Sequence, residues 1–379
     1  MPNLLERLYE RLTSENVAEQ LATDYNTQFG RTAIAGQELV GARLLPERLE
    51  RRDMFREVLA KQKGFVANDN SAFSPPQIKQ SGFSVGSFLA ELGNIDIASQ
   101  FTADDIEAII HLAQYDDNIV FARMVDWLNE SVNMAIRKKS EIQRWQAIVN
   151  GAVQIVGMDG RRYTLLYPNL PGQRRNITGG TVAAPAGWYS PTYDPFLDLI
   201  AVRNFFSSQG RIIREIWGDA DIVDAMINNA QVRSRLATSL TIVGSELRTV
   251  ETFVTDEAIN AYMRNQLGMP GIQKYDTVYE TQTGSGFFKA RGALVFVATT
   301  DLREIYYDER GAEQMIINNT LGYYARGRAA GEVNPGIVIR TKFRDIKPQS
   351  VYAEGVTKGL PILQDPSAVA VLNIQKPTP

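Results

Sequence analysis

The chain has 379 residues, and its 40 Lys plus Arg against 43 Asp plus Glu give a formal net charge of −3. This near-neutral net charge is not typical of a protein that binds the phosphate backbone of nucleic acids, so a dedicated nucleic-acid binder is not expected. The absence of cysteine excludes disulfides, thiolate nucleophiles and sulfur-based zinc sites, and the single histidine, His111, excludes multi-histidine metal sites.

The first residues show apolar side chains at helical spacing. Leu4, Leu5, Leu8 and Leu12, followed by the stretch 17–22, predict one or two short amphipathic helices. No stretch reaches the roughly 18 apolar residues that a membrane helix needs, and the start alternates acid and base where a signal peptide is apolar. We therefore expect a protein of a cytosol-like compartment with no membrane partner.

Residues 30–93 differ in character, because Gly, Ser, Asn and Pro are frequent and apolar residues are sparse. Short alternating stretches within this segment predict exposed strands. Such a segment cannot bury enough apolar surface to stand alone. We expect a long hairpin or arm that is ordered by packing on another surface, most simply on a neighbouring subunit.

A long helix is the strongest periodic signal in the sequence. The pattern from Thr102 to Asp105 is a capping box that opens a short helix expected from Ile106 to Ala113. From 116 to 150 an apolar stripe at helical spacing continues without Pro or Gly, and Gly151 is the predicted stop. At about 1.5 Å per residue this predicts a rod of around 50 Å.

The second half mixes helices and strands without a regular repeat. Asp159-Gly160 predicts a hairpin turn, and Asp194-Pro195 predicts the start of a helix that ends at Gly210. Further helices are expected after Asp219 and Thr255, with buried strands at 211–217 and 292–300 and late strands after 337. This order favours the α+β class over a doubly wound sheet.

No catalytic, cofactor or metal site is predicted. His111 has no Ser or Asp arranged as a triad, which favours a packing or surface role. Asp219, Asp221 and Asp224 could hold a hard cation, but their place at a predicted helix start favours capping. The segment 283–292, TGSGFFKARG, has two early glycines without a strand–loop–helix context, so a loop between strands is favoured over a phosphate cradle.

Four patches together resemble a known family. They are LVGARLLPER at 39–48, EIQRWQAIVNG at 141–151, SPTYDPFLDLIAV at 190–202 and the ending KPQSVYAEGVTKGLPILQDPSAVAVLNI at 347–374. In this order the chain resembles the lambda-type major capsid protein E family of tailed bacteriophages, which has the Hong Kong 97 type of capsid fold. The resemblance covers nearly the whole chain.

The resemblance implies a division of the chain into four parts. Residues 1–30 are the expected N-terminal arm and 31–98 the extended β-hairpin loop, which we call the ribbon. The peripheral domain is expected to comprise 99–189 and 321–350, with its spine helix at 116–150 and a sheet that includes the hairpin around Asp159-Gly160. The axial domain is expected to comprise 190–320 and 351–379.

The resemblance also implies a structural, non-enzymatic role. The subunit is expected to form pentamers and hexamers of an icosahedral head in the virion, assembled in the host cytoplasm and holding double-stranded DNA without specific binding. Expected partners are other copies, a portal protein, and a scaffold or decoration protein.

The predicted functional residues lie along the ribbon. Mixed charges between 43 and 63 favour a solvated face or a salt-bridged subunit contact. We expect intersubunit contacts at Leu44, Leu45, Pro46, Arg48, Arg51 and Arg52. Bends are expected at Gly36, Gly41, Gly64 and Gly82. Replacing Leu44 and Leu45 by Asp is then expected to leave the monomer folded and to stop shell formation.

Three other classes stay open at this stage. An encapsulin-like compartment shell shares the expected fold, and protein cargo instead of DNA would favour it. A hydrolase with an Asp/Glu pair is the enzyme alternative. A ring-forming tail or connector protein would give rings in place of closed shells.

Overall fold

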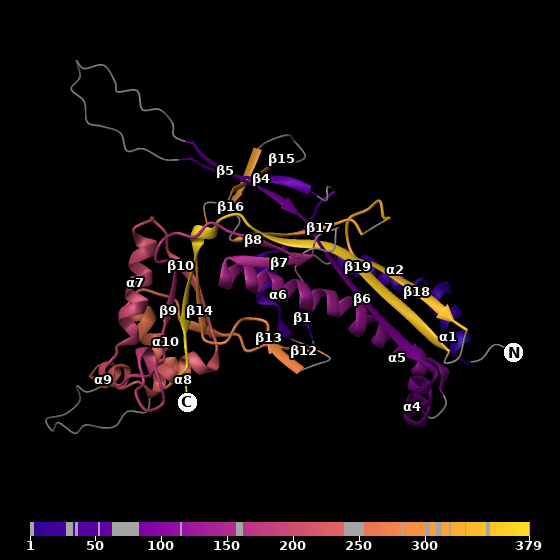
Figure 1. Ribbon diagram of the computed structural model, residues 1–379, viewed down its shortest axis with the longest axis horizontal. Helices are drawn as coiled ribbons and strands as arrows, with labels where there is room; N and C mark the ends of the chain where they lie inside the picture. The colour runs from indigo at the N-terminus through magenta and orange to yellow at the C-terminus, as the bar shows by residue number, and fades with distance from the viewer. Residues whose placement is uncertain are drawn as a thin grey trace, which may run out of the picture.

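The computed structural model describes residues 4–27, 33–34, 37–51, 54–62, 83–113, 116–156, 162–238, 254–281, 284–300, 303–307, 313–317, 320–329, 331–345 and 349–378. Figure 1 shows an elongated molecule, with a sheet covered by helices at one end and the N-terminal helices at the other. A two-stranded ribbon projects from the side between these ends.

A long strand, β19 (Ser350–Leu363), organises the sheet that we call the peripheral sheet. One edge of β19 pairs antiparallel with β6 (Gly93–Thr102). Its other edge pairs with β18 (Val338–Arg344) and then with β17 (Gly322–Gly327). The short strand β3 (Glu47–Leu49) adds to the far side of β17 in parallel.

The predicted spine is confirmed as one continuous helical rod that packs against β19. It comprises α5 (Asp117–Leu128), a π-helical turn η1 (Asn129–Met134) and α6 (Ala135–Asn150). Asp116 caps its start by accepting a hydrogen bond from the Asn118 amide, and Gly151 ends it at a φ of 63°, where an L side chain would be strained.

The N-terminal helices cover the outer end of the peripheral sheet (Figure 1). Helices α1 (Leu4–Ser14) and α2 (Val17–Thr27) bury Leu5, Leu8 and Leu12 against this sheet and α5. Nearby, α4 (Ala103–Ala113) begins at the predicted capping box, where the Asp105 carboxylate accepts from the Thr102 amide at 2.7 Å. This helix therefore starts about three residues earlier than predicted.

The second sheet, which we call the axial sheet, has the strand order β11-β10-β14-β20-β9. Its central strand β14 is buried along its whole length, as its unbroken apolar run predicts. The strands are β9 (Arg174–Ile177), β10 (Ile213–Gly218), β11 (Ile272–Lys274), β14 (Ala293–Ala298) and β20 (Val369–Ile374).

Helices pack on the axial sheet through a second apolar core. They are α7 (Pro195–Ser207), α8 (Ala220–Asn228), α9 (Ala230–Thr238) and α10 (Asp256–Asn265). The predicted caps are confirmed, because Asp194, Asp219 and Thr255 accept hydrogen bonds from the first-turn amides of α7, α8 and α10. Short 3-10 turns are η2 (Gly187–Tyr189) and η3 (Pro366–Ala368).

The described strands of the ribbon are β4 (Met54–Gln62) and β5 (Phe83–Glu91), antiparallel over their whole lengths. The predicted range 31–98 is too wide, because β3 and the start of β6 within it pair in the peripheral sheet, so the ribbon means β4 and β5 from here on. Smaller elements are α3 (Val40–Leu44) and four two-stranded sheets: β1 (Ala33–Ile34) with β2 (Gln37–Glu38), β7 (Ala152–Val156) with β8 (Arg162–Leu166), β12 (Val278–Thr281) with β13 (Gly284–Phe287), and β15 (Arg303–Tyr307) with β16 (Glu313–Ile317).

The pairing differs from the predicted grouping of strands in two respects. The β7–β8 hairpin is confirmed, although its predicted turn lies outside the described residues, and it forms a sheet of its own instead of joining the late strands. Strand β19, which the predicted boundary at 351 places in the axial domain, runs through the middle of the peripheral sheet. Its length of 14 residues lets it pair with strands from distant parts of the chain.

Candidate functional site

The segment 39–51, which leads into the ribbon, is held by main-chain hydrogen bonds to the peripheral sheet. The Leu321 amide donates to the Leu44 carbonyl at 3.0 Å, and the Tyr324 amide donates to the Pro46 carbonyl at 2.7 Å. Beyond β3, the Glu50 amide donates to the Arg326 carbonyl at 2.8 Å. The ribbon therefore projects from a root that is hydrogen-bonded to the peripheral sheet.

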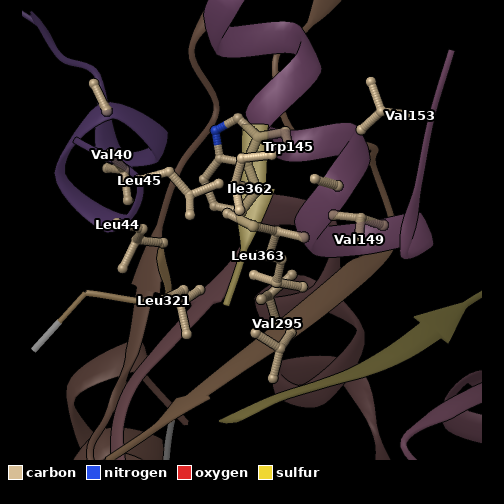
Figure 2. Close-up of a cluster of buried hydrophobic side chains, with 14 of the residues drawn as sticks. Val40, Leu44, Leu45, Trp145, Val149, Val153, Val295, Leu321, Ile362 and Leu363 are labelled. Carbon is tan, nitrogen blue, oxygen red and sulfur yellow. The ribbon is translucent and has the colours of Figure 1, made fainter. Parts of the chain in front are cut away.

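Apolar side chains of this root lie inside the subunit. Leu44 is 3% exposed and Leu45 is 0% exposed, and Figure 2 shows both among Trp145, Leu321 and Ile362. In this conformation neither side chain has surface to offer to another subunit. The predicted contact role of Leu44 and Leu45 is thus replaced by internal packing, because α3 fills the space between the spine helix and β17.

Four charged residues, three of them buried and Glu47 half-buried, stabilise the root; we call Glu47, Glu141, Arg144 and Arg326 the root cluster. Glu47 from β3 pairs with Arg144 of α6 at 3.1 Å and with Arg326 of β17. Both guanidinium groups lie over the Tyr324 ring, 4.6 and 4.8 Å from its centre. Breaking one partner of such a buried pair is strongly destabilising, so the cluster fixes β3 on the spine.

Glu141 is fully buried within the root cluster, with an exposure of 0%. Its Oε1 accepts hydrogen bonds from the Gly41 amide at 2.8 Å, Trp145 Nε1 at 2.9 Å and the Tyr275 hydroxyl at 3.1 Å. Burial raises the pKa of this carboxyl, while Arg144 and the three donors oppose the rise.

Gly41 serves this close approach and is not a bend. It lies in α3, and a Cβ placed on it would be 2.7 Å from Glu141 Oε1. The residue has to be glycine because the carboxylate occupies the space of a side chain. The predicted bend at Gly41 is therefore wrong, and the reason is the packing of α3 on the spine helix.

The remaining predicted residues are more exposed or lie outside the described part. Pro46 is half-buried and Arg51 is exposed. The Arg48 side chain is 56% exposed, pairs with Glu50 at 3.0 Å and lies over the Tyr323 ring. The positions outside the described residues are Arg52, Gly36, Gly64 and Gly82.

Sequence reasoning missed the root cluster, although one signal for it was present. Glu141 lies four, seven and eight residues before Trp145, Ile148 and Val149, so the helical period places it on the buried face of the spine. A charged residue at an apolar position of a helix indicates a buried polar partner. Its partners Gly41 and Tyr275 are 100 and 134 residues away, which no local pattern reveals.

Two of the three acidic residues singled out at α8, Asp219 and Asp221, are bound by other groups of the protein. Asp219 caps the helix and also accepts from the buried Lys289 ammonium at 3.1 Å, which confirms the predicted capping role. Asp221 pairs with Arg291 at 2.6 Å and with Lys376 at 3.0 Å. Asp221 and Asp224 border a cleft of about 360 Å³ that Lys376, after the C-terminal strand, also lines.

Two searches over the described ranges complete the survey of sites. Within them, no group of three or more His, Cys, Asp or Glu side chains is arranged to hold a metal ion. None of the helices described is both long enough and apolar enough to span a bilayer. The geometry present is that of a structural junction, in which charged side chains and hydrogen bonds join three parts of the chain.

Comparison with known proteins identifies the fold. No protein-family model and no curated protein matches the sequence. A crystal structure described as a prophage capsid protein of E. coli CFT073 matches with a TM-score of 0.52 at 13% identity, covering 94% of this chain and 98% of that chain. The chain therefore has the fold of that protein, which confirms the predicted α+β class and Hong Kong 97 type of capsid fold.

Two further solved structures are similar to a lower degree. A phage-related protein from Bordetella bronchiseptica RB50 has a TM-score of 0.49 at 10% identity, with 94% of this chain and 96% of that chain covered. The SrpI encapsulin from Synechococcus elongatus PCC 7942 has a TM-score of 0.39 at 12% identity, with 90% of this chain and 89% of that chain covered.

Proposed function

We propose that this chain is a structural shell subunit that assembles into pentamers and hexamers of an icosahedral phage head enclosing double-stranded DNA. The fold shared with the prophage capsid protein along nearly the full length of both chains supports this proposal. The sequence supports it independently, because the ribbon, the spine and the four resembling patches occur in the order expected for such a subunit.

The ribbon is the observation that carries the proposal. Strands β4 and β5 pair with each other, and among the described elements their main contacts are mutual. Figure 1 shows them projecting away from both sheets. A two-stranded ribbon alone is at best marginally stable in water, so it needs a second surface. In a closed symmetric assembly every copy supplies that surface to the next.

Exposed apolar side chains on the body of the subunit fit this role. Leu166 on β8 is 73% exposed, Leu197 on α7 is 57% exposed, and Ile212 before β10 is 71% exposed. We assign them to contacts between copies, together with Pro46, Arg48, Arg51 and Arg52 at the entry to the ribbon. The nearly balanced net charge of −3 suits a shell that encloses DNA without binding it tightly.

Other expected partners follow from the same proposal. A head of this kind needs a portal protein, and a scaffold or decoration protein can join it. The subunit would then be located in the virion after assembly in the host cytoplasm. No enzymatic activity is proposed, and the charges of the root cluster are engaged with one another and with the Tyr275 hydroxyl.

Sedimentation velocity followed by negative-stain electron microscopy tests the proposal. The full chain is expressed alone and then with its neighbouring genes, and closed icosahedral particles are expected in at least one case. Packaged DNA in those particles supports a phage head, whereas protein cargo would replace that reading with a compartment shell. Rings, or a persistent 42 kDa monomer in both preparations, would overturn the shell proposal.

A further inference from the structure

Helix α3 at the root of the ribbon also contacts the axial sheet. The Arg43 guanidinium makes two hydrogen bonds to the Glu215 carboxylate of β10, at 3.1 and 2.8 Å. The same carboxylate accepts from Trp217 Nε1 at 2.9 Å, and Arg43 lies 5.4 Å from the centre of the Trp217 ring. A bidentate pair of this kind fixes orientation as well as distance.

A second link joins the spine to the axial sheet through Tyr275, which follows β11 and is 5% exposed. Its ring stacks on Trp145 of the spine with centres 5.2 Å apart and meets Trp217 edge-on at 6.3 Å. Its hydroxyl donates to Glu141 Oε1 at 3.1 Å. Tyr275 therefore contacts the spine and the axial sheet at one point.

Both links end on groups that also hold the root of the ribbon. Glu141 Oε1 receives donors from α3, from the spine and from Tyr275, so one oxygen atom joins three segments. A shift of the axial sheet against the spine withdraws one buried donor from this acceptor, and a buried donor without an acceptor is costly. Such a shift therefore strains the contact that positions Gly41.

We propose that Glu141, Tyr275 and the Arg43–Glu215 pair are positioning residues that couple the direction of the ribbon to the orientation of the axial domain. This inference rests on the proposed function. When a neighbouring copy holds the ribbon, the coupling transmits that contact to the axial domain of the same subunit. Each subunit then adopts its ribbon and axial orientations together, which keeps the curvature of the growing shell uniform.

Hydrogen exchange on the unassembled full chain tests the coupling without requiring shells. Tyr275→Phe deletes only the hydroxyl that reaches Glu141. Amides of 40–50 are expected to exchange at least about five-fold faster in this variant, the lower end of typical coupling energies. Tyr279→Phe is the matched control, because it removes a hydroxyl four residues away on β12. A purely local loss of packing would raise exchange around residue 275 and leave 40–50 unchanged, which would overturn the proposal.

A second variant keeps the test decisive if Tyr275→Phe fails to fold. Arg43→Gln removes the other link from the ribbon side, and faster exchange in the axial strands β10 and β11 is expected. Where wild-type shells form, both variants are expected to give a broader distribution of shell diameters by electron microscopy. Exchange rates and shell diameters that equal those of the wild type in both variants would refute the coupling but not the proposed function. Absence of shells from the wild type would refute the proposed function and leave the exchange result standing.

Discussion

Truncating Leu45 tests whether the root of the ribbon belongs to the subunit core or to a contact between subunits. Its side chain is 0% exposed, and Figure 2 shows it beside Trp145 of the spine helix and Ile362 of β19. Removing such a leucine forfeits its transfer free energy and leaves a cavity, for a total of about 2–5 kcal/mol. We expect about 3 kcal/mol for Leu45→Ala, because the hydrogen-bonded strands and the spine restrict collapse around the site.

Replacing both Leu44 and Leu45 by Asp is expected to unfold the subunit. Each substitution adds an unpaired buried carboxylate to the loss of packing, at several kcal/mol per charge. The sum is comparable to the roughly 5–15 kcal/mol that typically stabilises a domain. This outcome replaces the sequence-based expectation that the double variant leaves a folded monomer unable to assemble.

Urea unfolding of the unassembled subunit, followed by circular dichroism and tryptophan fluorescence, measures these effects. Leu166→Ala is the matched control, since its side chain is 73% exposed and surface truncations usually cost less than about 0.5 kcal/mol. A loss below about 1 kcal/mol for Leu45→Ala would contradict the packing argument. If the Leu44→Asp, Leu45→Asp variant folds and only its assembly fails, the result would support the predicted contact between subunits.

Three further predictions address the exposed surface and the root cluster. Leu166→Asp is expected to change the free energy of unfolding by less than about 0.5 kcal/mol and to abolish particles in sedimentation velocity; particles like those of the wild type would remove β8 from the proposed contact. Gly41→Ala places a Cβ 2.7 Å from Glu141 Oε1, so a cost of about 1–3 kcal/mol is expected in urea unfolding, and a neutral effect would show that α3 can shift freely. Burial raises the pKa of Glu141 above its ordinary 4.5, so the folded state binds this proton more readily than the unfolded state. The free energy of unfolding of the wild type, relative to Glu141→Gln, should therefore increase as the pH falls from neutral through the raised pKa. A difference that grows with rising pH would contradict the raised pKa.

The sequence by itself determined the parts of this protein that depend on neighbouring residues. The apolar stripe of 116–150 produced the spine, and Gly151 ended it at a positive φ. Asp194, Asp219 and Thr255 capped the helices that they were predicted to cap. These features are decided within a few residues, by helical spacing and by the unpaired amides of the first turn.

The predicted ribbon also followed from composition. A polar segment that cannot bury its own core has to project or to pack on another surface, and β4 with β5 does project. The order of the four resembling patches added the fold, which the prophage capsid protein confirms. Neither source indicated which side chains at the base of the ribbon face inward.

Only the tertiary structure decided the role of that base. From the sequence, Leu44 and Leu45 could belong to an interface or to a core. In the structure both side chains are buried in a core, because α3 packs against the spine helix. Glu47 meets Arg326 across 279 residues of sequence, and Glu141 meets Tyr275 across 134. Helical periodicity and capping act over one or two turns, whereas these pairs exist because β3, α6, β17 and the axial sheet converge at one point of the folded chain.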